Sequence, residues 1–118
     1  MTPSVHRISL AKGWQPAPSH ASAGEPASLY LWTRTFQATS GLLAAPSVRL
    51  RAKPNSAESP GMSAIALNDT ALPLRSETTE YDWEIAALLR ASNRIAIYVA
   101  MSDPTLFPFD VWLEVPES

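Results

Sequence analysis

The side chains best suited to acid–base chemistry are two pairs of carboxylates. Asp82 and Glu84 lie in one apolar segment, and Asp110 and Glu114 lie in another. In a β-strand the members of each pair share a face, because alternate side chains point the same way. Glycoside hydrolysis uses such paired acids. The residues between them are apolar, however, as in a strand with one face in the core and one in water. We therefore interpret both pairs as a solvated sheet face.

Other catalytic or metal-binding arrangements are not found in the sequence. His6 falls on a candidate first strand and His20 in a candidate loop, with no Gly-x-Ser-x-Gly turn or paired-histidine metal spacing near either. With Gly 4 in the chain, a glycine-rich phosphate loop is also absent. Oxygen ligands for a structural calcium exist but do not cluster as Asp-x-Asp; they are Asn68, Asp69, Asp103 and Asp110. We expect no metal, no cofactor and no enzymatic activity.

The aromatic residues are the better candidates for a binding site. The inward sets of the last two apolar segments are Ile95, Ile97, Val99 and Met101, then Val111, Leu113 and Val115. This parity turns Tyr98 and Trp112 outward, among Arg94, Asp110 and Glu114. An outward Trp and Tyr beside charges could hold a ligand or a protein, and if their strands are neighbours they form one patch. The alternative is that loops cover them.

Three aromatics in candidate loops are further possible ligand contacts. They are Trp14, Phe107 and Phe109. They are candidates because jelly-roll modules often bind ligands at the rim. The alternative, which we favour, is that Phe107-Pro108-Phe109 plugs one end of the sandwich.

Composition limits the class of protein. The chain has 118 residues, a size typical of one domain, and we expect a single β-sandwich over residues 1–118. Net charge is -2, so we expect neither nucleic acid nor a membrane as partner. Cys 0 excludes disulfides. Residues 1–7 lack the apolar core of a signal peptide, and no segment has membrane-spanning length, so the cellular location stays open.

Short apolar runs separated by prolines predict an all-β chain. The expected strands span residues 5–10, 28–37, 47–52, 63–67, 70–74, 80–85, 93–101 and 110–115. Residues 15–26 and 53–62 are expected loops, and residues 86–90 are the one helical candidate. Asn68-Asp69 predicts a two-residue hairpin turn, because both residue types tolerate a positive φ.

Four segments resemble one known family. Trp32-Thr33-Arg34-Thr35-Phe36 is similar to its "Tyr/Trp-x-Arg-x-Phe" strand, and residues 64–72 are similar to its "Val-x-Leu-Asn-Gly-x-x-Leu" hairpin. The run from Tyr81 to Asn93 is similar to its "aromatic, x, aromatic, Asp-Ile-Thr, x, Leu-Leu, Lys-Pro-Gly-x-Asn" segment, and the closing residues 108–115 are similar to its terminal strand. The family is the sugar-binding domain of family-two glycoside hydrolases, of the β-galactosidase and β-glucuronidase type. Asp69, Ala86 and Ser92 depart from its Gly, Thr and Gly.

The resemblance implies an antiparallel β-sandwich of the galactose-binding-like jelly-roll type. It also implies an accessory role, because the catalytic carboxylates of those hydrolases lie in a separate barrel that this chain lacks. Our first hypothesis is a non-catalytic carbohydrate-binding module. The second is a structural or protein-interaction sandwich that does not bind sugar, and a third, a small hydrolase using the acidic pairs, is the weakest. The sequence indicates neither the sugar nor the oligomeric state.

Overall fold

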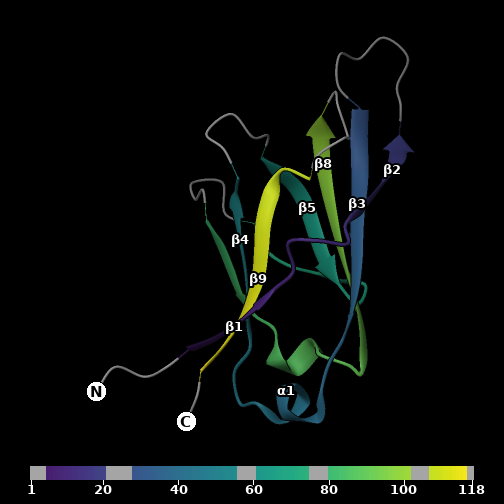
Figure 1. Cartoon of the computed structure of the whole chain (residues 1–118). Coiled ribbons are helices and arrows are strands. Elements are labelled where there is room, and N and C mark those ends of the chain that lie inside the picture. Colours follow the sequence, from purple (N-terminus) through teal and green to yellow (C-terminus); the bar gives the residue numbers. More distant parts are fainter. Residues whose placement is uncertain (1–4, 21–27, 56–60, 75–79, 102–106, 117–118) are drawn as a thin grey trace.

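The chain forms two antiparallel β-sheets that pack face to face, as Figure 1 shows. The computed structural model describes residues 5–20, 28–55, 61–74, 80–101 and 107–116. One sheet has four strands in the order β1-β9-β4-β7, and the other has five in the order β2-β3-β8-β5-β6. The expected all-β sandwich is therefore confirmed.

The strand bounds follow the alternation of apolar residues. The four-stranded sheet contains β1 (Val5–Ser9), β4 (Arg49–Pro54), β7 (Tyr81–Glu84) and β9 (Phe109–Pro116). The five-stranded sheet contains β2 (Gln15–His20), β3 (Ser28–Gln37), β5 (Met62–Leu67), β6 (Thr70–Ala71) and β8 (Ser92–Met101). β3 has the predicted bounds, and it lies inside its sheet, between β2 and β8.

The core is made of the inward side chains of both sheets. Ile95, Ile97 and Val99 on β8 face Leu50 and Leu113 from the other sheet, and all are fully buried. Trp32 and Trp83 are also buried, which confirms that their strands pack inward. Arg34, on the same side of β3 as Trp32, donates to the backbone carbonyls of Lys12 and Thr35. Its charge is thus hydrogen-bonded, as a partly buried guanidinium requires.

The hairpin between β5 and β6 turns through Asn68 and Asp69, both at positive φ (51 and 68). This confirms the predicted turn. Asn68 also ties the hairpin to β8, because its Oδ1 accepts from the Arg94 N–H at 2.9 Å and its Nδ2 donates to Asn93 Oδ1 at 2.9 Å. Asn93 in turn bonds both backbone groups of Arg90. The two asparagines of the resembling segments therefore lock one corner of the sandwich.

Several elements differ from the sequence-based expectation. The strand expected over residues 70–74 is only β6 (Thr70–Ala71), and β4 extends through Lys53 and Pro54 into the expected loop. Residues 15–20 were expected to be a loop but form β2. β2 lies at the edge of its sheet, and an edge strand tolerates the missing N–H groups of Pro16 and Pro18. A helix, α1 (Ser40–Ala44), was not expected; Thr39 caps it by accepting from the Leu42 N–H at 3.2 Å, and Leu42 is buried. The predicted helical turn is present as the short 3₁₀ helix η1 (Ala86–Leu88). Figure 1 places both helices at one end of the sandwich.

Candidate functional site

The outer face of the four-stranded sheet carries the charged residues. Leu50, Ala52, Val111 and Leu113 point into the core, so the residues between them point to solvent. The strand register then sets opposite charges side by side. Across β1, β9, β4 and β7 one row reads Arg7, Glu114, Arg49 and Glu84. The next rows read Ser9, Trp112, Arg51 and Asp82, then Asp110 and Lys53.

Glu114 is the centre of this face. Its Oε1 accepts from Trp112 Nε1 at 2.9 Å and from Arg7 Nη2 at 3.3 Å, and its Oε2 accepts from Arg51 Nη1 at 3.4 Å. The hydrogen bond from Trp112 lowers the pKa of the Glu114 carboxyl, and the two guanidinium groups add to this, outweighing the opposite effect of burial. Glu114 is thus held ionised and fixes the indole orientation.

Trp112 lies on the sheet surface next to two guanidinium groups. Arg7 Cζ is 4.9 Å from the centre of the indole ring, and Arg51 Cζ is 5.8 Å from it. Both distances are within the range of a cation–π contact. The ring is half-buried, so part of its surface remains exposed.

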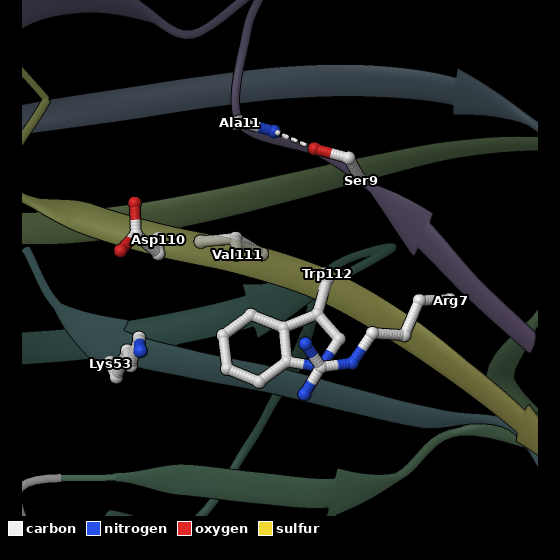
Figure 2. A pocket seen from close by; sticks show the side chains of 7 residues that line it. All are labelled: Arg7, Ser9, Ala11, Lys53, Asp110, Val111 and Trp112. Atoms are coloured by element: carbon white, nitrogen blue, oxygen red, sulfur yellow. Dashed lines mark hydrogen bonds between the residues drawn. The ribbon is translucent and has the colours of Figure 1, made fainter. Parts of the chain in front are cut away.

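A hollow of about 360 Å³ opens beside Trp112. Its lining residues are Arg7, Ser9, Ala11, Lys53, Asp110, Val111 and Trp112. Figure 2 shows the six-membered part of the indole reaching toward Lys53 and Asp110, with the Arg7 guanidinium at the other end of the ring. Lys53 and Asp110 are directly opposite in register, and neither side chain has a hydrogen bond or ion pair within the part of the chain that the structure describes.

The structure thus adds residues to the predicted site. Trp112 was predicted to point outward among charges that include Asp110 and Glu114, and it does, but Arg7 and Lys53 were not named as its neighbours. The parity of residues 49, 51 and 53 would have placed Lys53 on an outer face. No signal in the sequence shows that β1 and β4 flank β9.

Tyr98 does not join this site. It points outward as predicted, but from β8 in the other sheet, where Leu31 of β3 and Ala64 of β5 are its register partners. Arg94 also faces outward on β8, opposite Thr35, and is exposed. The expectation that Tyr98 and Trp112 could form one patch is wrong, because their strands are not neighbours and the rings lie on opposite outer faces.

The rim aromatics pack on one another. Trp14 stacks on Phe107 with ring centres 4.2 Å apart, and Phe107 lies 5.2 Å from Trp32 and 5.8 Å from Phe109. Phe109 is only 2% exposed, so it offers no surface to a ligand, and this candidate is corrected. Trp14 and Phe107 are half-buried against the core. The packing of these rings against the core agrees with the plug interpretation.

The acidic pair of Asp82 and Glu84 is bonded to neighbouring groups. Asp82 Oδ1 lies 3.1 Å from Arg49 Nε, and Glu84 Oε2 accepts from the Val48 N–H at 2.9 Å. Burial raises the pKa of Glu84, but hydrogen bonds from Ser47 and two backbone N–H groups outweigh it, so the pKa is lowered. One of those N–H groups belongs to Ala86, at the start of η1, where the resembling family has a threonine.

Neither a metal cluster nor a membrane-spanning helix is found in the described ranges. No three metal-binding side chains of His, Cys, Asp or Glu gather among residues 5–20, 28–55, 61–74, 80–101 and 107–116. Of the calcium candidates, Asn68 and Asp69 lie in the β5–β6 hairpin and Asp110 lies on the opposite sheet, while Asp103 is outside the described residues. The helices within those ranges are too short to cross a bilayer.

Comparisons with known proteins support the fold. No protein-family model and no curated protein sequence matches this chain. Eight chains of solved structures match it. One is a β-D-mannosidase from Dictyoglomus thermophilum, with a TM-score of 0.63 and 12% sequence identity over 82% of this chain. The match covers 16% of the mannosidase chain, so this β-sandwich is similar in fold to a small part of that enzyme.

Proposed function

We propose that this chain is a non-catalytic carbohydrate-binding module and that it binds sugar in the hollow beside Trp112. The observation that carries the proposal is an outward indole next to two charged side chains, Lys53 and Asp110, that have no partner of their own in the described part of the chain. A pyranose ring has an apolar C–H face and a rim of hydroxyls. The indole can stack on the C–H face, and the charged pair can form hydrogen bonds with the hydroxyls.

The geometry of the site supports one bound ring. Small-molecule sites usually span about 300–1,000 Å³, and the hollow, at about 360 Å³, is at the lower end of that range. The indole is held by Glu114 before any ligand arrives. Because the ring is already held in place, it loses little conformational entropy on binding, and this lowers the free-energy cost of binding.

The likeness to part of a β-D-mannosidase supports a carbohydrate context. The same comparison supports an accessory role, since the similar region is a small share of that enzyme. On the charged sheet face, Asp82 and Glu114 are in ion pairs, Glu84 accepts a backbone hydrogen bond and Asp110 lies beside a lysine. None of these four carboxyls is buried, whereas a general acid of glycoside hydrolysis usually lies in an apolar, water-excluded pocket.

The test is a glycan array followed by titration calorimetry on the purified chain and on Trp112→Ser. Removal of the stacking surface is expected to weaken sugar binding about five- to 150-fold, taking the value of about 1–3 kcal/mol known for a nucleic-acid base stacked on an aromatic ring as the measure for a stacked pyranose. Tyr98→Ser is the matched control, because it removes an outward aromatic from the opposite sheet. Equal loss in both variants, or no glycan bound by the parent, would contradict the proposal.

A second candidate function is protein interaction through the five-stranded sheet. The observation in its favour is that Tyr98 is flanked by uncharged residues, Leu31 on β3 and Ala64 on β5, so this face is apolar around the ring. Light scattering would decide it. A stable dimer that Tyr98→Ser dissociates, and that ignores sugars, would favour this function over the first.

A further inference from the structure

We infer that the hollow beside Trp112 selects neutral sugars with two adjacent free hydroxyls and rejects their uronic acid counterparts. This inference rests on the proposed function and names the ligand class. It comes from the charges that surround the hollow and from the hydrogen-bonding capacities of Lys53 and Asp110.

The three arginines of this face are already paired with carboxylates. Arg7 and Arg51 both bond Glu114, at 3.3 and 3.4 Å, and Arg51 also lies 3.6 Å from Glu80. Arg49 pairs with Asp82. An anionic ligand therefore meets no uncompensated positive group among these arginines, and it would have to break an existing pair to gain one.

Lys53 is the remaining cation at the hollow, and Asp110 is its direct neighbour across the strands. Side chains opposite each other in an antiparallel pair have Cβ atoms about 5 Å apart. A sugar carboxylate drawn to Lys53 would thus be placed beside a second carboxylate. The attraction and the repulsion nearly cancel, so the carboxylate gains little from this site.

Hydroxyls suit the pair better. Asp110 can only accept hydrogen bonds, and Lys53 can only donate them. A hydroxyl does both, so one hydroxyl can donate to Asp110 while its neighbour accepts from Lys53. Both bonds involve a charged partner, which makes them the stronger kind. A carboxylate bound to Lys53 would leave Asp110 without a donor. If an acidic sugar instead offered its two ring hydroxyls to the pair, its carboxylate would still lie on the same ring, within range of repulsion by Asp110.

Arg7 contributes further hydrogen bonds and does not reverse the preference for neutral sugars. Its side chain is 66% exposed and lies over Trp112, with one guanidinium nitrogen bonded to Glu114. Because Arg7 also lines the hollow, guanidinium N–H groups that are not bonded to Glu114 can donate to a ring or hydroxyl oxygen. They stay in the field of Glu114, which reduces their pull on an anion.

The experiment compares ligands that differ in one group. β-1,4-linked mannohexaose and cellohexaose are titrated against the hexamers of β-1,4-linked mannuronic and glucuronic acid, which carry a carboxylate in place of the primary alcohol. The parent is expected to bind at least one neutral hexamer, and at least tenfold more tightly than its acidic counterpart at about 0.1 M salt. Each comparison is run at two salt concentrations, because a weak repulsion shrinks with screening.

Variants then assign the preference to the pair. Asp110→Asn is expected to weaken neutral binding several-fold and to improve binding of the acidic hexamer, so that the preference collapses. Lys53→Gln is expected to weaken neutral binding without any gain for the acid. Lys12→Gln is the matched control; Lys12 is exposed, does not line the hollow and should leave both affinities unchanged.

The outcomes separate the two claims. Tighter binding of an acidic hexamer at Trp112 would overturn the inference and leave the proposed function standing. An affinity for the neutral hexamers that Asp110→Asn leaves unchanged would also overturn the inference and leave the proposed function standing. If the parent binds none of the four hexamers and no glycan on the array, the proposed function fails, and the inference fails with it.

Discussion

Replacing Asn93 by Ala should destabilise the sandwich clearly more than a polar substitution at an exposed position. Asn93 is 2% exposed and is the one buried polar residue among those the structure describes. Its Oδ1 accepts from the Arg90 N–H and from Asn68 Nδ2, both at 2.9 Å, and its Nδ2 donates to the Arg90 carbonyl at 2.6 Å. The substitution removes all three bonds at once.

The size of the effect follows from what the partners can do afterwards. Each intramolecular hydrogen bond is typically a net contribution of about 1 kcal/mol, and a buried group left unpaired costs more. Arg90 is exposed, so water can replace part of what its backbone loses. Asn68 keeps its bond to the Leu88 carbonyl at 3.0 Å. We therefore expect a loss of about 2–4 kcal/mol, or a fall in Tm on the order of 10 °C.

The assay is urea unfolding followed by tryptophan fluorescence and far-ultraviolet circular dichroism. Gln37→Ala is the matched control, since it removes one exposed bond, from Gln37 Nε2 to Ser92 Oγ at 2.7 Å, near the same corner. It should cost less than about 0.5 kcal/mol. A loss below about 1 kcal/mol for Asn93→Ala, with an unchanged m value, would refute the view that this cluster locks the corner. Equal losses in both variants would refute it as well.

Two further predictions concern the turn and the charged face. Asp69→Gly should be neutral or stabilising by up to about 1 kcal/mol in thermal unfolding, because Asp69 is exposed at φ 68, a backbone region that glycine enters without strain; a loss of 1 kcal/mol or more would show that its carboxylate has a role. Glu114→Gln should flatten the dependence of unfolding free energy on pH. The folded pKa of Glu114 is below its ordinary value, so its contribution is present above the unfolded value of about 4.3 and is lost as pH falls through the lower folded value. Parallel parent and Glu114→Gln curves between about pH 5 and 2 would contradict this.

Local patterns in the chain were sufficient for much of the fold. The alternation in residues 28–37 predicted the bounds of β3, because an interior strand needs an apolar face that a one-residue slip would lose. The Asn68-Asp69 turn depends on the φ preference of two residues alone. The outward orientation of Trp112 and Tyr98 depends only on parity within one strand. Each of these features is set by neighbours in sequence.

The two elements that the sequence analysis missed, β2 and α1, depend instead on tertiary contacts. β2 holds two prolines and was expected to be a loop, and only its pairing with β3 at the edge of the sheet makes it a strand. α1 is five residues long, so its stability depends on its cap and on the burial of Leu42 rather than on helix propensity.

The candidate site is decided by strand order. Parity alone turns Trp112 outward together with Asp110 and Glu114, but it does not say which residues of other strands surround the ring. Arg7 and Glu114 are 107 positions apart in the chain and become partners because β1 lies next to β9. Lys53 meets Asp110 because β4 lies on the other side. Tyr98 is excluded because β8 belongs to the other sheet. The order of strands is set by how both apolar faces close one core, and this long-range packing leaves no mark in any single segment.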